Sequence, residues 1–173
     1  PLQPWPTPQP LDPARLDAGT REAWADAQSA FGTKESPAVK AGDLKRLVSR
    51  NLPPEFAAKV QYQLGLEAEN DGAFDEARRC YEGILDRFTN VSSEVGLPWK
   101  TLAGLRLVRL ASQDSSGSAQ GRGLVSDMAA DAVLSPSVMS ETVLEKLAHL
   151  EEDADGPAHN AHRVWNAHQS ARE

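Results

Sequence analysis

Apolar side chains recur along most of the chain at intervals of three and four residues, the spacing of one face of an α-helix. Val, Ile and Thr never gather into the alternating runs that are typical of strands, so the pattern predicts no sheet. Prolines, glycines and short polar turns divide the chain into about eight such stretches. The predicted helices cover residues 13–31, 37–52, 54–69, 74–88, 99–111, 124–135, 140–150 and 158–172.

Capping residues and proline predict where the helices begin. Asp12 followed by Pro13 is typical of an N-cap with proline in the first turn, so the first helix is expected to start there. Its apolar face is expected to carry Leu16, Ala23, Trp24, Ala27 and Phe31. The apolar faces of the second and fourth helices are expected to include Val48 and Phe74.

The third and fourth helices, over residues 58–88, carry a more specific pattern. Small residues, Gly65 and Ala77, fall where two helices of a hairpin cross closely, and Gly72 falls in the turn, where a positive φ is required. The residues of the pattern are Leu64, Gly65, Ala68, Gly72, Phe74, Glu76, Ala77 and Tyr81. In this order and spacing they resemble the tetratricopeptide repeat, a helix–turn–helix unit of about 34 residues.

This resemblance implies an all-α fold, an antiparallel stack of helix hairpins. Residues 20–53 look like a degenerate upstream repeat, and Trp99 looks like the start of a downstream one. Ile84 and Thr89 depart from the family's usual alanine and proline, and a generic helical hairpin remains the alternative. The resulting division is a proline-rich extended leader (1–12), a repeat domain (13–157) and a polar C-terminal helix or linker (158–173).

A second resemblance concerns the order of the parts. A degenerate repeat, a good repeat, a Gly96-Leu97-Pro98 segment, a leucine-rich helix and a trailing helical pair together look like the extracytoplasmic sensor region of some bacterial membrane-bound histidine kinases of two-component systems. That resemblance implies a periplasmic domain of a larger membrane-anchored protein, with the helix around Trp165 leading to a second span. The alternative is a soluble cytoplasmic scaffold or assembly adaptor. Because the chain starts with Pro1, we expect a piece of a longer protein.

The net charge and the lack of catalytic motifs limit the classes of function that we expect. The net charge is −7 with no basic stripe, which argues against nucleic acid and against anionic lipid surfaces. No apolar run reaches the length of a membrane span, so we expect this segment not to insert into a membrane. No hydrolase, nucleotide-binding or metalloprotease motif is present, and Gly117, Gly121 and Gly123 follow no strand that could open a phosphate loop. We therefore expect no enzyme and no cofactor.

Two sets of reactive residues, the histidines and Cys80, bear on the alternative hypothesis of an enzyme or a metal protein. The four histidines are His149, His159, His162 and His168; His159 and His162 are three residues apart, a spacing that can bind a transition metal. Their polar surroundings favour a solvated helix face, and the acidic run at 151–155 lacks the ligand spacing of a calcium loop, so we expect a charged turn there. Cys80 follows two arginines, yet a lone cysteine is most often a small packed apolar residue. We expect no metal site, with an enzyme or metal protein that uses the histidines as the alternative.

The repeat resemblance also implies a binding surface. In tetratricopeptide proteins the first helix of each pair lines a concave groove for a peptide or helix of a partner protein. On this chain the corresponding residues are Lys59, Tyr62, Leu66, Glu69 and Asn70. Tyr62 and Leu66 stand where the carboxylate-clamping variant of the family has lysine and asparagine, so capture of a chaperone's acidic tail is not expected.

Overall fold

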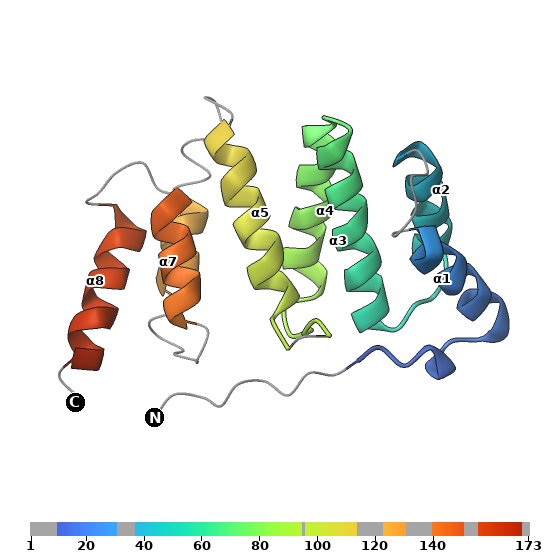
Figure 1. Ribbon diagram of the computed structural model, residues 1–173, viewed down its shortest axis with the longest axis horizontal. Helices are drawn as coiled ribbons and strands as arrows, with labels where there is room; N and C mark the ends of the chain where they lie inside the picture. The colour runs from blue at the N-terminus through green and yellow to red at the C-terminus, as the bar shows by residue number, and fades with distance from the viewer. Residues whose placement is uncertain are drawn as a thin grey trace. The chain divides into compact units, whose positions relative to one another are not determined.

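The computed structural model describes residues 10–30, 37–94, 96–113, 123–130, 140–150 and 156–170 (Figure 1). Within these ranges the protein is all-helical, with eight α-helices, one 3-10 helix and no strand, as the sequence predicts. The elements are η1 (Pro13–Arg15), α1 (Ala18–Ala30), α2 (Pro37–Val48), α3 (Pro54–Asn70), α4 (Phe74–Arg87), α5 (Trp99–Gln113), a helix over 123–130, α7 (Ser140–Leu150) and α8 (Pro157–Ser170). Most of the predicted leader, together with Phe31, Gly117, Gly121 and the acidic run at 151–155, lies outside the described residues.

The chain divides into two compact units, and the division falls within α5, between Ala103 and Gly104. We call the unit that ends at Ala103 the first unit and the one that begins at Gly104 the second unit. In the first unit, consecutive helices pack against each other: α1 on α2, α2 on α3 and α3 on α4. Its core contains Leu16, Trp24, Ala27, Leu44, Leu47, Phe56 and Val60. The rings of Trp24 and Phe56 meet edge to face, with centroids 4.8 Å apart, so α1 is fixed against the first turn of α3.

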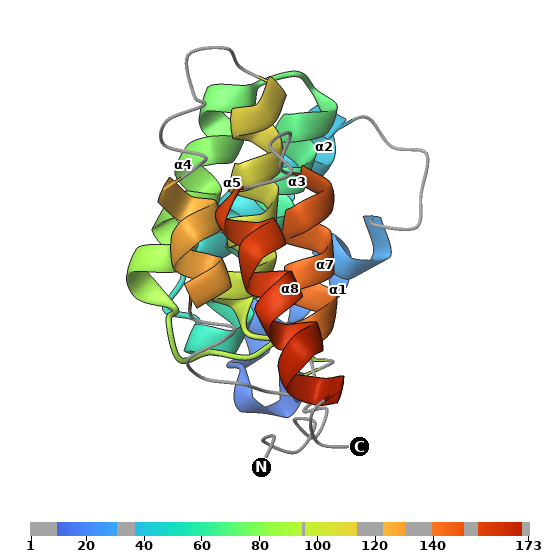
Figure 2. The same cartoon turned by 90° about the vertical axis from the view of Figure 1, so that its left-hand side faces the viewer.

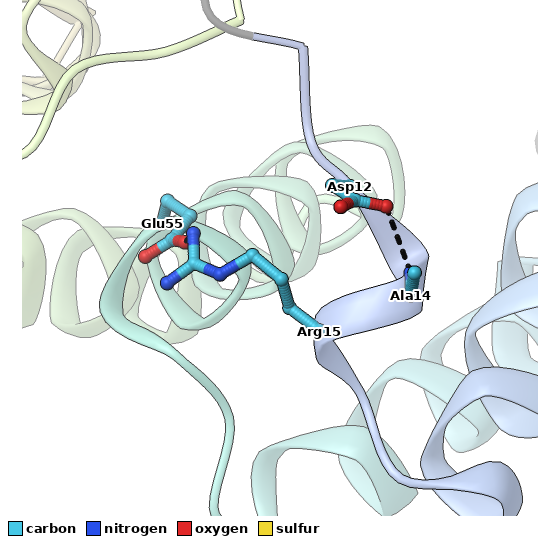
Figure 3. A network of polar contacts seen from close by, with 4 residues as sticks. All are labelled: Asp12, Ala14, Arg15 and Glu55. Carbon is cyan, nitrogen blue, oxygen red and sulfur yellow. Dashed lines mark hydrogen bonds and ion pairs between the residues drawn. The ribbon is translucent and has the colours of Figure 1, made fainter.

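The beginning of α1 differs from the sequence prediction. Asp12 does act as an N-cap, because its Oδ1 accepts a hydrogen bond from Ala14 N at 2.9 Å, but it caps η1 and not α1 (Figure 3). Leu16 then takes an extended conformation and is buried, which ends the turn. The prediction that the first helix starts at Asp12 is therefore wrong. It starts after Asp17, whose Oδ1 accepts from Thr20 N at 3.0 Å.

An ion pair holds η1 against the rest of the unit. The guanidinium of Arg15 contacts the carboxylate of Glu55, which lies in the first turn of α3 (Figure 3). Arg21 adds two hydrogen bonds from α1, to the carbonyl oxygens of Pro13 and Leu16. The short segment before α1 is thus attached to both α1 and α3.

The Asp17 cap predicts a pH dependence of stability. Hydrogen bonds from the side chain and backbone N–H of Thr20 hold the pKa of Asp17 below its ordinary value. A carboxylate whose folded-state pKa is lowered stabilises the fold above its unfolded pKa, near 3.9, and this stabilisation is lost as the pH falls through the lowered value. We expect Asp17→Asn, which can still cap but cannot titrate, to flatten the decline of the melting temperature below about pH 4. Thermal unfolding at stepped pH, with Asp12→Asn as the matched variant, measures this; an unchanged acid slope in Asp17→Asn would contradict it.

Two residues predicted on apolar faces are exposed. Val48, the last residue of α2, is 50% exposed, and Phe74, the first residue of α4, is 49% exposed. The periodicity identifies the correct face in both helices, since Leu44 and Leu47 of α2 and Ala77 and Tyr81 of α4 are buried. Val48 is the last residue of α2 and Phe74 the first residue of α4, so both lie at the ends of the buried faces.

The second unit has its own core, and α7 and α8 pack against each other within it (Figure 2). The core contains Val108, Val125, Ala129, Leu144, Leu147, Ala158 and Trp165. Gly104 leaves room for Met128, whose Sδ would lie 2.6 Å from a Cβ at that position. On α8, Trp165 is buried while Val164 is 59% exposed. Among the described residues, no helix is long and apolar enough to cross a membrane.

Candidate functional site

The hairpin of α3 and α4 is closed by a tight turn at residues 71–73. Asp71 N, Gly72 N and Ala73 N donate to carbonyl oxygens in the last turn of α3, at 2.8–3.0 Å. Gly72 has a φ of 73°, in the left-handed region that favours glycine. This turn brings the first turn of α4 directly beside the end of α3.

Close packing in the hairpin depends on Gly65. A Cβ at Gly65 would lie 2.5 Å from Cε1 and 2.7 Å from Cζ of Tyr81, so the tyrosine ring occupies the space that a side chain would need. Tyr81 is fully buried, and its hydroxyl donates to Glu69 Oε1 at 2.5 Å. Ala77 and Ala68 are also buried, whereas Leu64 is partly buried and packs against the core of the first unit. All eight residues of the repeat pattern lie in α3, in α4 or in the turn between them.

A second polar link between α3 and α4 was not identified from the sequence. Gln61 is buried and donates from Nε2 to Cys80 O at 2.8 Å, while its Oε1 accepts from Arg87. The amide lies over Gly83, because a Cβ there would collide with Gln61 Nε2. A buried glutamine facing a glycine 22 positions later has no signal in the sequence of either helix by itself, since the pairing depends on how the two helices are rotated.

The predicted binding residues of α3 differ in how accessible they are. The side chain of Lys59 is 15% exposed, and its Nζ lies 2.7 and 2.8 Å from the two carboxylate oxygens of Glu94. The same ammonium lies 5.6 Å from the ring centroid of Trp24, within the range of a cation–π interaction. Lys59 therefore connects three elements: α1, α3 and the segment before α5.

Tyr62 takes part in an aromatic cluster. Its ring centroid lies 5.6 Å from that of Tyr81 on α4 and 5.2 Å from that of Trp99, the first residue of α5. Glu69 accepts the hydroxyl of Tyr81, as described above. Of the remaining two predicted residues, Asn70 is exposed, whereas Leu66 is half-buried like Lys59, Tyr62 and Glu69. Three of the five predicted residues, Lys59, Tyr62 and Glu69, thus contact other residues of the chain, and Asn70 is the exposed one.

The segment between α4 and α5, residues 89–98, has a defined structure where it is described. Ser93 N donates to Leu97 O at 2.7 Å, Gly96 N to Ser93 O at 2.8 Å and Trp99 N to Val91 O at 2.9 Å. A single antiparallel bridge joins Ser92 and Pro98. Hydrogen bonds thus connect the described residues on the two sides of position 95.

The reactive residues of the sequence lie on three helices: Cys80 on α4, His149 on α7, and His159, His162 and His168 on α8. Burial, followed by the charge of Glu76, raises the pKa of the Cys80 thiol, which opposes formation of the nucleophilic thiolate. His149 is 79% exposed, with its Nε2 4.0 Å from Glu145 Oε1 one turn away. The side chain of His168 lies outside the described residues. Across the described ranges, no three His, Cys, Asp or Glu side chains are grouped so that they could hold a metal ion.

Comparison with known proteins gives no assignment: no family model, no curated protein and no solved structure matches this chain.

Proposed function

We propose that this chain is a non-catalytic protein-interaction module of the tetratricopeptide kind, which binds a peptide or helix of a partner protein on the face of α3. The observation that carries the proposal is the α3–α4 hairpin, in which Gly65, Gly72 and Tyr81 make the close crossing, the turn and the core contact that the repeat pattern requires. Repeats of this kind stack to present the first helix of each pair to a partner.

The C-terminal half of the α3 face suits such a partner. Leu66 is half-buried, so it offers apolar surface without being sealed in the core, and exposed Asn70 lies one turn further along the same helix. An amide beside an apolar side chain can bind the backbone of an extended peptide or the polar edge of an amphipathic helix. The shifted pKa of Cys80 and the histidines on α7 and α8 give no support to the competing enzyme hypothesis.

For the setting of the module we propose the extracytoplasmic sensor part of a larger bacterial signalling protein, with a soluble scaffold or adaptor as the alternative. The sensor proposal is supported by the Gly96-Leu97-Pro98 segment that leads into α5. Fractionation of the source cells with an antibody against this chain separates the two. A band heavier than 18.7 kDa in the membrane pellet supports the sensor, and a free band of that mass supports the adaptor.

Site-specific photo-crosslinking in the source cells tests partner binding. We expect a photoreactive phenylalanine analogue at position 66 or 70 to give a discrete, protease-sensitive product with one partner protein, because half-buried Leu66 and exposed Asn70 lie one turn apart on the proposed binding face of α3. The matched control is the same analogue at Asp86, an exposed position on α4. A synthetic peptide that covers the crosslinked partner residues should then compete for the product.

Equal yields from positions 66 and 86 would indicate non-specific contact and would contradict the proposal. The absence of any product from positions 66 and 70 would contradict it as well.

A further inference from the structure

Phe74 is an exposed aromatic residue at the turn end of the α3–α4 hairpin. It is the first residue of α4 and is 49% exposed, and in the described ranges it is the only Phe, Tyr or Trp that is exposed. Asn70, Asp71 and Gly72, which precede it across the tight turn, are exposed as well. An accessible aromatic ring offers a partner both an apolar face and the negative charge of its π-system.

Negative charge accumulates around Phe74. Residues 60–77 contain five acidic residues and no lysine or arginine: Glu67, Glu69, Asp71, Asp75 and Glu76. Two of these carboxylates are already used by the chain, since Glu69 accepts from Tyr81 and Glu76 pairs with Lys45 at 2.9 Å. The carboxylates of Asp71 and Asp75, which precede and follow Phe74, have no hydrogen bond or ion pair with any residue that the structure describes.

One of these two carboxylates is unfavourably placed for the stability of the fold. Asp71 is the C-cap residue of α3, and the last turn of this helix contains no basic residue. The C-terminus of a helix carries a partial negative charge, which repels a carboxylate and attracts a cation. Asp75 lies in the first turn of α4, where an acidic residue is favourable. The helix dipoles thus account for Asp75 but not for Asp71.

We infer that the end of the hairpin, which we call the turn surface (Asn70, Asp71, Gly72, Phe74 and Asp75), binds an arginine-bearing segment of the partner protein. A guanidinium can stack on an aromatic ring while its N–H groups donate to carboxylates beside that ring. A lysine ammonium has no planar fork, so arginine fits this combination better. A bound cation would also offset the charge of Asp71 at the C-terminus of α3.

The inference rests on the proposed function, because it states the chemistry that a partner on the face of α3 would bring to the C-terminal end of that helix. The turn surface continues directly from Asn70, the last residue of α3 and one of the predicted binding residues.

Two probe peptides test the turn surface on the purified chain by fluorescence anisotropy. The first is a short fluorescein-labelled amphipathic peptide of arginine and leucine, and the second has glutamine in place of each arginine. We expect the arginine peptide to bind about tenfold more tightly than the glutamine peptide. Its affinity should fall about fivefold in the double variant Asp71→Asn/Asp75→Asn and about threefold in Phe74→Ala. No binding of the arginine peptide to the parent chain would overturn the inference.

The matched control is the double variant Asp26→Asn/Asp86→Asn, which removes the same charge from exposed positions on α1 and α4. We expect it to weaken binding less than about twofold, because exposed charges at a distance are screened by salt. Equal losses in the two double variants would mean that the peptide responds only to the net charge of −7, which overturns the inference. Unchanged affinity in Phe74→Ala would overturn it as well.

Thermal unfolding of Asp71→Asn checks that its carboxylate has no structural role. We expect this variant to melt no earlier than the parent chain, since it removes a charge from the negative end of α3. A lower melting temperature would show that the carboxylate stabilises the hairpin, and the inference would fail.

The crosslink from position 70 separates the inference from the proposed function. We expect its yield to fall in the Asp71→Asn/Asp75→Asn background. A product with an unchanged yield would overturn the turn surface and leave the proposed function standing. The absence of any product from positions 66 and 70 would overturn both, whatever the peptides show.

Discussion

Replacing Phe56 with alanine is expected to lower the free energy of unfolding by about 3–5 kcal/mol. Phe56 is fully buried and lies in the first turn of α3. Its ring meets Trp24 of α1 edge to face, with centroids 4.8 Å apart. Truncation removes this contact and leaves a cavity that the neighbouring helices fill only in part.

Phe74→Ala is the matched control for Phe56→Ala. It removes the same atoms from the neighbouring helix α4, but Phe74 is 49% exposed, so we expect a loss below about 1 kcal/mol. Urea unfolding followed by far-ultraviolet circular dichroism measures both variants. Equal losses would mean that Phe74 is covered in the folded protein and that the assigned core is wrong.

Helix positions could be predicted from the sequence because they depend on local information. Proline at 37, 54 and 157 starts α2, α3 and α8, within one residue of the predicted helix starts. The exposed end residues Val48 and Phe74 could not be predicted in this way. A hydrophobic pattern gives the direction in which a side chain points, and burial depends also on whether another helix reaches that far.

The candidate site was predictable in part for a similar reason. The repeat resemblance predicts α3 as the helix that faces a partner, but it gives no sign that Glu94 pairs with Lys59, 35 positions away. The Gln61–Arg87 hydrogen bond is of the same kind, since it crosses between helices. Such contacts depend on the rotation of each helix about its axis, and a single sequence contains no covarying pairs from which that rotation could be inferred.

Gly65→Ala tests the close crossing on which the repeat assignment depends, and we expect it to destabilise the protein by about 1–3 kcal/mol. Inside a helix, alanine is more favourable than glycine by about 1 kcal/mol. Helix propensity alone would therefore predict that Gly65→Ala stabilises α3. The added Cβ, however, would lie 2.5 Å from Cε1 of Tyr81. The ring cannot move away easily, because Tyr81 is fully buried and its hydroxyl bonds to Glu69.

Gly42→Ala separates the two effects. Gly42 lies in α2, is exposed, and a Cβ there would meet nothing within 4 Å, so propensity acts alone and we expect a gain of about 0.5–1 kcal/mol. Opposite signs for the two glycine-to-alanine changes, measured by urea unfolding, are the expected result. If Gly65→Ala also stabilised the protein, α3 and α4 would be further apart than described. The hairpin that carries the proposed function would then lose its main support, because a tetratricopeptide-like unit needs that close crossing.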